Sequence, residues 1–240
     1  MNGETTTGRE MGVFGKIIGI FTSPRETFES IDRKPSWLVP FIINLVFVVV
    51  LQYLVMDIAI KDRVAIMRAK NVPAEQMEVM ESRMQGPIKY AGMIVGPVAT
   101  LIVWAILAGI LLFGGNTIMG GETRYKKVFS VVAWSSLVGL VGGILKTFLI
   151  LSKGTTRGVV TSLAVLLPTP PLGHKASVLY RFLSKFDLFT IWNLILWIIG
   201  LAVIYRFTTK KSSTLVLSLW AIWIVISITL GSILTVGFGG

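Results

Sequence analysis

The sequence groups its apolar residues into five long blocks that hold almost no charge, and this arrangement limits the available folds more than any other feature. The blocks cover residues 37–57, 90–113, 128–151, 187–205 and 213–236. A helix needs about 20 apolar residues to cross the hydrocarbon core of a bilayer. A soluble protein instead spreads charged residues along each surface helix. The pattern therefore predicts an all-α polytopic membrane protein with five transmembrane helices.

The charge balance points to a lipid partner. Of the 240 residues, 53% are hydrophobic, above the roughly 45–50% of soluble domains. The chain carries 23 Lys and Arg against 12 Asp and Glu, a net charge of +11. The basic residues flank the apolar blocks, and no nucleic-acid-binding motif accompanies them. We therefore expect anionic lipid headgroups, and not nucleic acid, as the partner of this charge.

The region before the first block divides into two parts. Residues 1–12 are rich in Thr and Gly, and we expect them to be disordered. Residues 13–36 are expected to form amphipathic helices in the membrane interface, because their apolar stripe is too short to span. The motif Ser23-Pro24-Arg25-Glu26 has the spacing of a capping box and predicts a second helix over 24–33. The apolar stripe consists of Val13, Phe14, Ile17, Ile18 and Phe21.

The remaining residues, 37–236, are predicted to form one five-span membrane domain. In its first charged connection, 58–89, the motif Pro73-Ala74-Glu75 opens a helix, so we expect a small helical hairpin outside the bilayer. Residues 176–186 show the spacing of an amphipathic helix along the surface. The apolar run 159–167 is too short to span, and it is either interfacial, re-entrant or a helix buried against the bundle.

Two glycine motifs predict a close helix contact. Gly92 and Gly96 lie in the second block, and Gly139 and Gly143 lie in the third. Small residues four apart allow two helix backbones to approach in lipid, where packing replaces the hydrophobic drive. We predict that the two motifs pack on each other within one chain. The alternative is the contact face of a homodimer.

Three polar residues inside or beside the blocks form a candidate polar site: Lys146, Asp187 and Asn193. A charge at the membrane centre costs about 2.5–3.5 kcal/mol on insertion scales. If the third and fourth spans run in opposite directions, Lys146 and Asp187 share one membrane depth, which predicts an ion pair. Alternatively, Lys146 snorkels to the headgroups and Asp187 only caps its helix.

The sequence lacks the residues that common catalytic sites require. It contains no cysteine and one histidine, His174, in a loop with Pro and Gly. Metal hydrolysis needs several His, Cys or carboxylate ligands, and a serine hydrolase needs a histidine base beside its nucleophile. We therefore expect no enzymatic activity, no catalytic residue, no metal and no cofactor.

Several stretches of the sequence resemble the Yip family, the Ypt/Rab-interacting proteins with a five-span Yip domain, in its bacterial form. They are SPRETF at 23–28, PSWLVP at 35–40, YKKVF at 125–129 after a Gly-Gly turn, DLFTIW at 187–192 and GLAVIY at 200–205. In order and spacing, the resemblance covers about residues 13–236.

The resemblance implies a cytosolic N-terminus, five spans, an external C-terminus and no known enzymatic activity. For a bacterial member, it implies the cytoplasmic (inner) membrane. Eukaryotic relatives are linked to Rab GTPase binding, vesicle traffic and membrane shaping. They carry a long cytosolic region before the first span, where this chain has only residues 1–36. The sequence therefore leaves a link to small GTPases open.

Two functions fit these observations. The first is a non-enzymatic scaffold that binds lipids or other membrane proteins and shapes the bilayer, supported by the stripe 13–21 and the helix 176–186. The second is a small transporter or channel that uses Lys146, Asp187 and Asn193, with 159–167 as a re-entrant segment. A sealed, glycine-packed bundle favours the first function, and a continuous polar cavity favours the second.

The orientation of the chain is a testable prediction. The segments on the N-terminal side and those on the opposite side each carry 11 Lys and Arg, so the count leaves orientation open. The links 114–127 and 206–212 are short and basic, which favours a cytoplasmic position for them and for the N-terminus. A reporter enzyme fused at Gly240 is therefore expected to be active only outside the cytoplasm. Activity only in the cytoplasm would contradict the predicted orientation.

Overall fold

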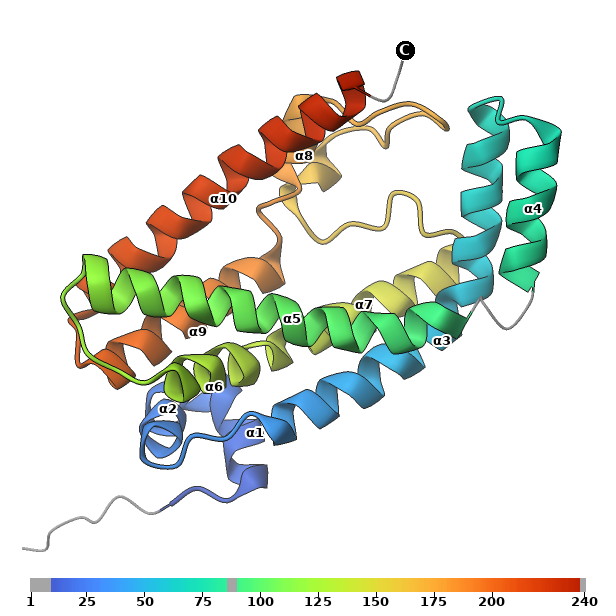
Figure 1. Cartoon of the computed structure of the whole chain (residues 1–240). Coiled ribbons are helices and arrows are strands. Elements are labelled where there is room, and N and C mark those ends of the chain that lie inside the picture. The colour runs from blue at the N-terminus through green and yellow to red at the C-terminus, as the bar shows by residue number, and fades with distance from the viewer. Residues whose placement is uncertain (1–9, 86–89, 238–240) are drawn as a thin grey trace, which may run out of the picture. The chain divides into compact units, whose positions relative to one another are not determined.

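The computed structural model describes residues 10–85 and 90–237 and is built from helices (Figure 1). Nine residues of the predicted disordered segment 1–12 lie outside this part of the chain. The elements, in chain order, are α1 (Val13–Thr22), α2 (Pro24–Arg33), α3 (Leu38–Ala69), α4 (Ala74–Gln85), α5 (Ala91–Phe113), the π-helix η2 (Gly114–Ile118), α6 (Tyr125–Ser135), α7 (Leu137–Lys153), the 3₁₀ turn η3 (Leu163–Leu166), α8 (Val178–Leu183), α9 (Leu188–Tyr205) and α10 (Thr209–Gly237).

The predicted all-α membrane fold is confirmed. Five stretches are helical, long and apolar enough to cross a membrane: Leu38–Ala69, Ala91–Ile118, Tyr125–Lys153, Leu188–Tyr205 and Thr209–Thr229. The first of these five helices, α3, continues 12 residues beyond the predicted span 37–57, through a charged stretch. The reason is that hydropathy marks the membrane-crossing part of a helix, whereas backbone hydrogen bonding continues wherever the residues allow it.

The third of these stretches is broken at Ser136, between α6 and α7. The Ser136 side chain donates a hydrogen bond to the Ala133 carbonyl at 2.6 Å. Such a bond competes with the helix ladder and bends the backbone. The Asn193 amide donates to the Ser135 carbonyl at 3.0 Å and so satisfies a backbone group at the break. This bond gives Asn193 a structural role in the bundle.

The described contacts group the chain into two compact units. Unit 1 comprises Met1–Ile43, Leu101–Val138 and Trp192–Leu219, and unit 2 comprises Asn44–Thr100, Gly139–Ile191 and Trp220–Gly240. Unit 1 gathers the connections predicted to share a side with the N-terminus. Unit 2 gathers the connections predicted for the other side.

In unit 1, α1 packs against α2, and α2 packs against α6. Phe28 and Ile31 of α2 are fully buried. The Lys127 ammonium on α6 pairs with the Asp32 carboxylate on α2, and the Trp134 indole N–H donates to the Ser36 carbonyl at 2.7 Å. The short N-terminal helices are therefore fixed to the membrane-crossing helices of their unit.

The predicted helix 24–33 is confirmed, but its predicted capping box is wrong. Ser23 has φ −143° and ψ 65° and makes no side-chain cap. Instead, the Thr27 hydroxyl donates to the Ser23 carbonyl at 3.0 Å. The Ser23 N–H, which Glu26 would accept in a capping box, donates instead to the Gly19 carbonyl at the end of α1, at 2.8 Å.

In unit 2, α3 and α4 form the predicted hairpin, which an Arg68–Glu81 ion pair joins at 3.2 Å (Figure 1). The run 159–167 is not a helix: it is extended around the single turn η3. The predicted helix 176–186 is present only as α8. Ser177 caps α8 by accepting a hydrogen bond from the Tyr180 N–H at 3.1 Å.

The glycine motifs contact α3. A Cβ added at Gly92 or at Gly96 would meet the Gln52 side chain at 3.8–3.9 Å, and one at Gly143 would meet Leu51 at 3.1 Å. A Cβ at Gly139 would meet nothing within 4 Å. The contact predicted between the two motifs is therefore replaced by contacts with the first membrane-crossing helix. The four-residue spacing predicts a helix face that allows close approach, but it does not predict which helix packs there.

Gly200 and Gly139 offer a matched test of packing. A Cβ at Gly200 would lie 2.5 Å from Val131 and 3.2 Å from the buried Phe28 ring. We expect Gly200→Ala to lower the free energy of unfolding by about 1–3 kcal/mol through overpacking. Gly139→Ala should leave it unchanged or raise it by up to about 1 kcal/mol, because alanine favours the helix. Thermal unfolding in detergent measures both variants, and equal stabilities would contradict the packing described.

Candidate functional site

The site occupies unit 2, where the connection between α7 and α9 is held in place by side chains of the helices around it. Carboxylates anchor both ends of this connection. We call residues 154–186 the cap segment. It contains η3 and α8 and otherwise lacks regular structure.

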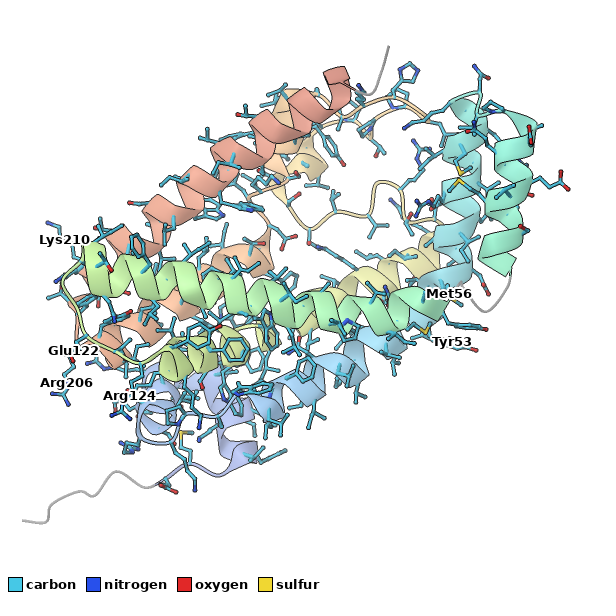
Figure 2. The ribbon with its side chains drawn as sticks, in the orientation of Figure 1. Tyr53, Met56, Glu122, Arg124, Arg206 and Lys210 are labelled. Carbon is cyan, nitrogen blue, oxygen red and sulfur yellow. The ribbon has the colours of Figure 1, made fainter. Side chains whose placement is uncertain are left out.

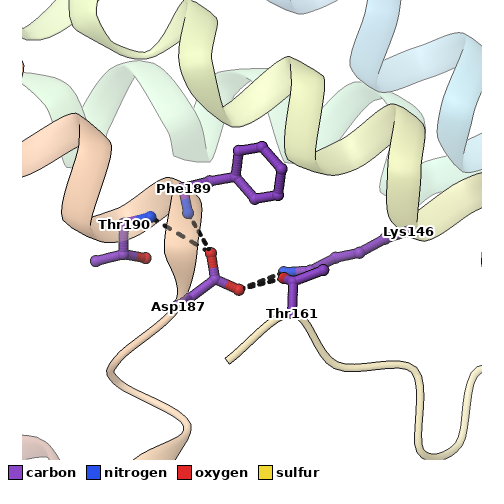
Figure 3. Close-up of polar contacts among 5 residues, drawn as sticks. All are labelled: Lys146, Thr161, Asp187, Phe189 and Thr190. Atoms are coloured by element: carbon purple, nitrogen blue, oxygen red, sulfur yellow. Dashed lines mark hydrogen bonds and ion pairs between the residues drawn. The ribbon is translucent and has the colours of Figure 1, made fainter. Parts of the chain in front are cut away.

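Asp187 anchors the end of the cap segment (Figure 3). Its Oδ1 accepts hydrogen bonds from the backbone N–H groups of Phe189, at 3.0 Å, and Thr190, at 3.3 Å. Its Oδ2 accepts from the Lys146 ammonium at 3.2 Å and from the Thr161 hydroxyl. The side chain therefore caps α9, pairs with α7 and holds the cap segment at the same time.

The predicted ion pair between Lys146 and Asp187 is present. The carboxylate has about four lone-pair positions, and four donors occupy them. Lys146 remains 42% exposed along its side chain. Asp187 is thus engaged in holding the fold, and a passing ion or substrate would have to displace one of its donors.

The backbone strengthens the same anchor. The Leu188 N–H donates to the Thr161 carbonyl at 3.3 Å, and the Leu163 N–H donates to the Phe186 carbonyl at 3.1 Å. Ser162 and Asp187 consequently pair as an isolated antiparallel bridge. The run that the sequence left as interfacial, re-entrant or helical is fixed here by strand-like hydrogen bonds next to the start of α9.

Asp62 of α3 anchors the start of the cap segment. Its Oδ2 accepts from the Thr156 N–H and from the Thr156 hydroxyl, both at 2.6 Å. The Thr155 hydroxyl donates to the same carboxylate at 2.9 Å. Gly154 ends α7 with φ +65°, a left-handed conformation that turns the chain toward Asp62.

Sequence reasoning did not identify Asp62. It lies in a charged stretch that looks like an ordinary solvated helix surface. The only local signal is the Thr155-Thr156 pair directly after Gly154, since such residues often bind a carboxylate near a helix end. Nothing in the sequence connects that pair to a residue more than 90 positions earlier.

A third anchor joins α8 to α10. The Arg181 guanidinium donates to the Ile228 carbonyl at 2.6 Å and to the Ser227 carbonyl at 3.3 Å. The Phe186 ring meets Trp220 edge to face at 5.2 Å between centroids. The Lys185 ammonium lies 4.4 Å from the centroid of the Trp223 ring. These contacts place α8 alongside α10 (Figure 1).

The structure does not bring all three predicted site residues together. Lys146 and Asp187 meet in unit 2, whereas Asn193 belongs to unit 1 and binds the Ser135 carbonyl there. Within the described part of the chain, the Asn193 Oδ1 and Ser135 Oγ atoms are buried without a hydrogen-bond partner. Asn193 therefore serves the helix break and not the Lys146–Asp187 pair.

Unit 1 carries a basic surface on its two short links. Tyr205 and Phe207 stack at 4.8 Å between ring centroids, and a Cβ at Gly121 would meet both rings. The two links thus pack against each other. Figure 2 shows the exposed side chains of Arg124, Arg206 and Lys210 on these links. Their position directly beside membrane-crossing helices suits contact with anionic headgroups.

The fold and the anchored segment define a class: an integral, multi-pass α-helical membrane protein. The Yip1 domain matches residues 18–231, and the chain therefore belongs to the Yip1 domain family. It is also similar to the membrane protein YknW of Bacillus subtilis (strain 168), with 28% identity over 224 residues, which cover 90% of each chain. No solved structure matches the chain.

The Lys146–Asp187 pair can be tested by a double-mutant cycle. We expect Lys146→Met and Asp187→Asn to act non-additively on the free energy of unfolding, with a coupling of about 0.5–3 kcal/mol. The exposed pair Arg68–Glu81 is a matched control, because surface ion pairs couple by about 0.2–1 kcal/mol. Chemical unfolding in detergent measures both cycles. Additive effects of the two substitutions would show that the pair contributes nothing.

Proposed function

We propose that this protein is a non-enzymatic scaffold that organises the membrane, with α1 inserted into the headgroup region of one leaflet. The observation that carries this proposal is the outward-facing apolar side of α1. On this helix, Val13, Phe14 and Ile18 are exposed, with Phe14 74% accessible. A helix of 10 residues is too short to span, so a bilayer surface is the environment that covers such a face.

The inner side of α1 explains why the apolar stripe faces out. Gly19 lies against the Thr27 side chain of α2, which a Cβ at position 19 would meet. Ile20 is fully buried, and Lys16 is only 7% exposed. Burial lowers the pKa of Lys16, against the opposing effect of Glu10. The packing between α1 and α2 therefore does not use Phe14 and Ile18.

Because α1 and α2 are attached to a membrane-crossing helix, insertion of α1 into one leaflet would act on the curvature of the bilayer. Phe28 and Ile31 fix α2 in the unit 1 core, and the Asp32–Lys127 pair ties it to α6. A rigid apolar wedge held beside membrane-crossing helices expands one leaflet more than the other. Such asymmetry favours curvature, and interfacial helices are known to respond to curvature in the same way.

Other features support a scaffold over a catalyst or a transporter. The described residues contain no group of three or more metal-ligating side chains, and the sequence has one histidine and no cysteine. The polar site suggested for a transporter is divided, since Asp187 is saturated by four donors and Asn193 serves the α6–α7 break. We further propose anionic lipids and other membrane proteins as partners, in a cytoplasmic membrane with the N-terminus inside.

The proposal predicts that the protein reshapes vesicles through α1. In liposomes that contain anionic lipid, we expect the parent protein to reduce vesicle diameter or form tubules, as seen by cryo-electron microscopy. Phe14→Asp and Ile18→Asp should abolish the effect, because burying a Phe or Ile side chain is worth about 1.5–3 kcal/mol. Thr22→Asp adds the same charge at an exposed polar position of α1 and should preserve it. Unchanged vesicles with the parent protein, or full activity of both apolar-face variants, would refute the proposal.

A further inference from the structure

We propose that η3 and α8 form a second lipid-binding surface, embedded in the bilayer beside α10 and selective for anionic lipid. We call it the cap patch. The inference deepens the proposed function by naming another lipid contact and its lipid class. It rests on that function only in taking lipid as the partner, because different residues in a different unit carry it.

The cap patch is an exposed apolar surface made by two elements that touch. η3 and α8 pack against each other, although they are separated in the chain by the Pro-rich stretch 168–171. Leu166 and Val165 are 75% and 63% exposed. The exposed apolar residues of the cap patch are Leu163, Val165, Leu166, Val178, Leu179 and Phe182. A group of this kind is larger than the scattered apolar residues of an ordinary soluble surface.

The contacts with α10 set the depth of the cap patch. α10 is apolar enough to cross the membrane over Thr209–Thr229. The cap segment touches α10 at Trp220, Trp223, Ser227 and Ile228. These four residues cover about 12 Å of helix rise and lie within the membrane-crossing stretch. α8 therefore lies beside the span, at the depth of its C-terminal half, and not beyond its end.

The Arg181 bonds agree with this depth. A guanidinium in water exchanges its donors freely with solvent, whereas in a low-dielectric environment bonds to carbonyls become strong and fixed. Arg181 directs its Nη2 at two successive carbonyls of α10. Directly after α8, Phe186 and Lys185 also contact α10, through Trp220 and Trp223. The cap segment is thereby held against the span with its apolar residues still exposed.

The charge of the cap segment selects the lipid. The cap segment contains four Lys and Arg and no Asp or Glu, and Lys153 at the end of α7 directly precedes it. Lys153 is exposed, and the Lys185 ammonium lies over the Trp223 ring. Lysine side chains at this depth reach toward the headgroups with their ammonium groups. Phosphate groups of anionic lipids are the complementary partner for an apolar surface with a purely basic surround.

The absence of cysteine permits a direct test of where the cap patch lies. Single variants Leu166→Cys and Val178→Cys would carry an environment-sensitive fluorophore in proteoliposomes of phosphatidylglycerol and phosphatidylcholine. Ile222→Cys, on the exposed apolar side of α10, is the lipid-facing control, and Glu78→Cys on α4 is the water-facing control. We expect both cap-patch probes to be quenched by spin-labelled lipid and protected from iodide, as at Ile222. Iodide quenching equal to that at Glu78 would overturn the proposal and leave the surface open to a soluble partner.

A second comparison tests the lipid class. Spin-labelled phosphatidylglycerol should quench the Leu166 probe about twofold more than spin-labelled phosphatidylcholine, and Lys153→Gln with Lys185→Gln should remove the difference. Equal quenching by both lipids in the unsubstituted background would overturn the selectivity. Phe14→Asp should not change either result. Absence of vesicle shaping by the parent protein, with intact cap-patch quenching, would therefore refute the proposed function alone. Vesicle shaping by the parent protein without quenching of the cap-patch probes by lipid would refute this inference alone.

Discussion

The structure depends on one constraint: hydrocarbon offers no hydrogen-bond partner, so each polar group at membrane depth must find one within the protein. The Asp187 carboxylate meets this constraint with four donors from three parts of unit 2. The Asn193 amide meets it in part: its Nδ2 donates to the Ser135 carbonyl where the helix breaks, while its Oδ1 is buried without a partner among the described residues. Arg181 meets it on the carbonyls of α10. These polar residues therefore act mainly by joining one element to another through hydrogen bonds.

These attachments leave apolar surfaces of the short helices α1 and α8 exposed. α1 is attached through its inner side to α2, and α2 to α6, so Phe14 remains outside. α8 is attached through Arg181, so Leu179 and its neighbours remain outside. In both cases, one side of the element is attached to the rest of its unit, and large apolar side chains on another side stay exposed. Exposed apolar faces of this kind suit the contact with the bilayer that we propose.

Membership of the Yip1 domain family fits this arrangement, because the matched residues 18–231 include both the α2 attachment and the cap segment. The similarity to YknW covers nearly the whole of both chains, so the comparison includes the short elements as well as the spans. The family match therefore includes most of the α1–α2 pair before the first span and the whole cap segment before the fourth.

The sequence by itself determined the five membrane-crossing helices and the helix 24–33, because hydropathy and proline position are local or one-dimensional properties. Membrane depth made the Lys146–Asp187 pair one of two alternatives, and the tertiary structure decided between them. Only the tertiary structure decided which helix faces Gly92 and Gly143, how 159–167 is bonded, and that Asp62 anchors Thr156. Those outcomes depend on side chains distant in sequence. A small-residue motif indicates that another helix packs there, and a lone carboxylate indicates that it needs hydrogen-bond donors. Only packing in three dimensions decides which helix and which donors these are.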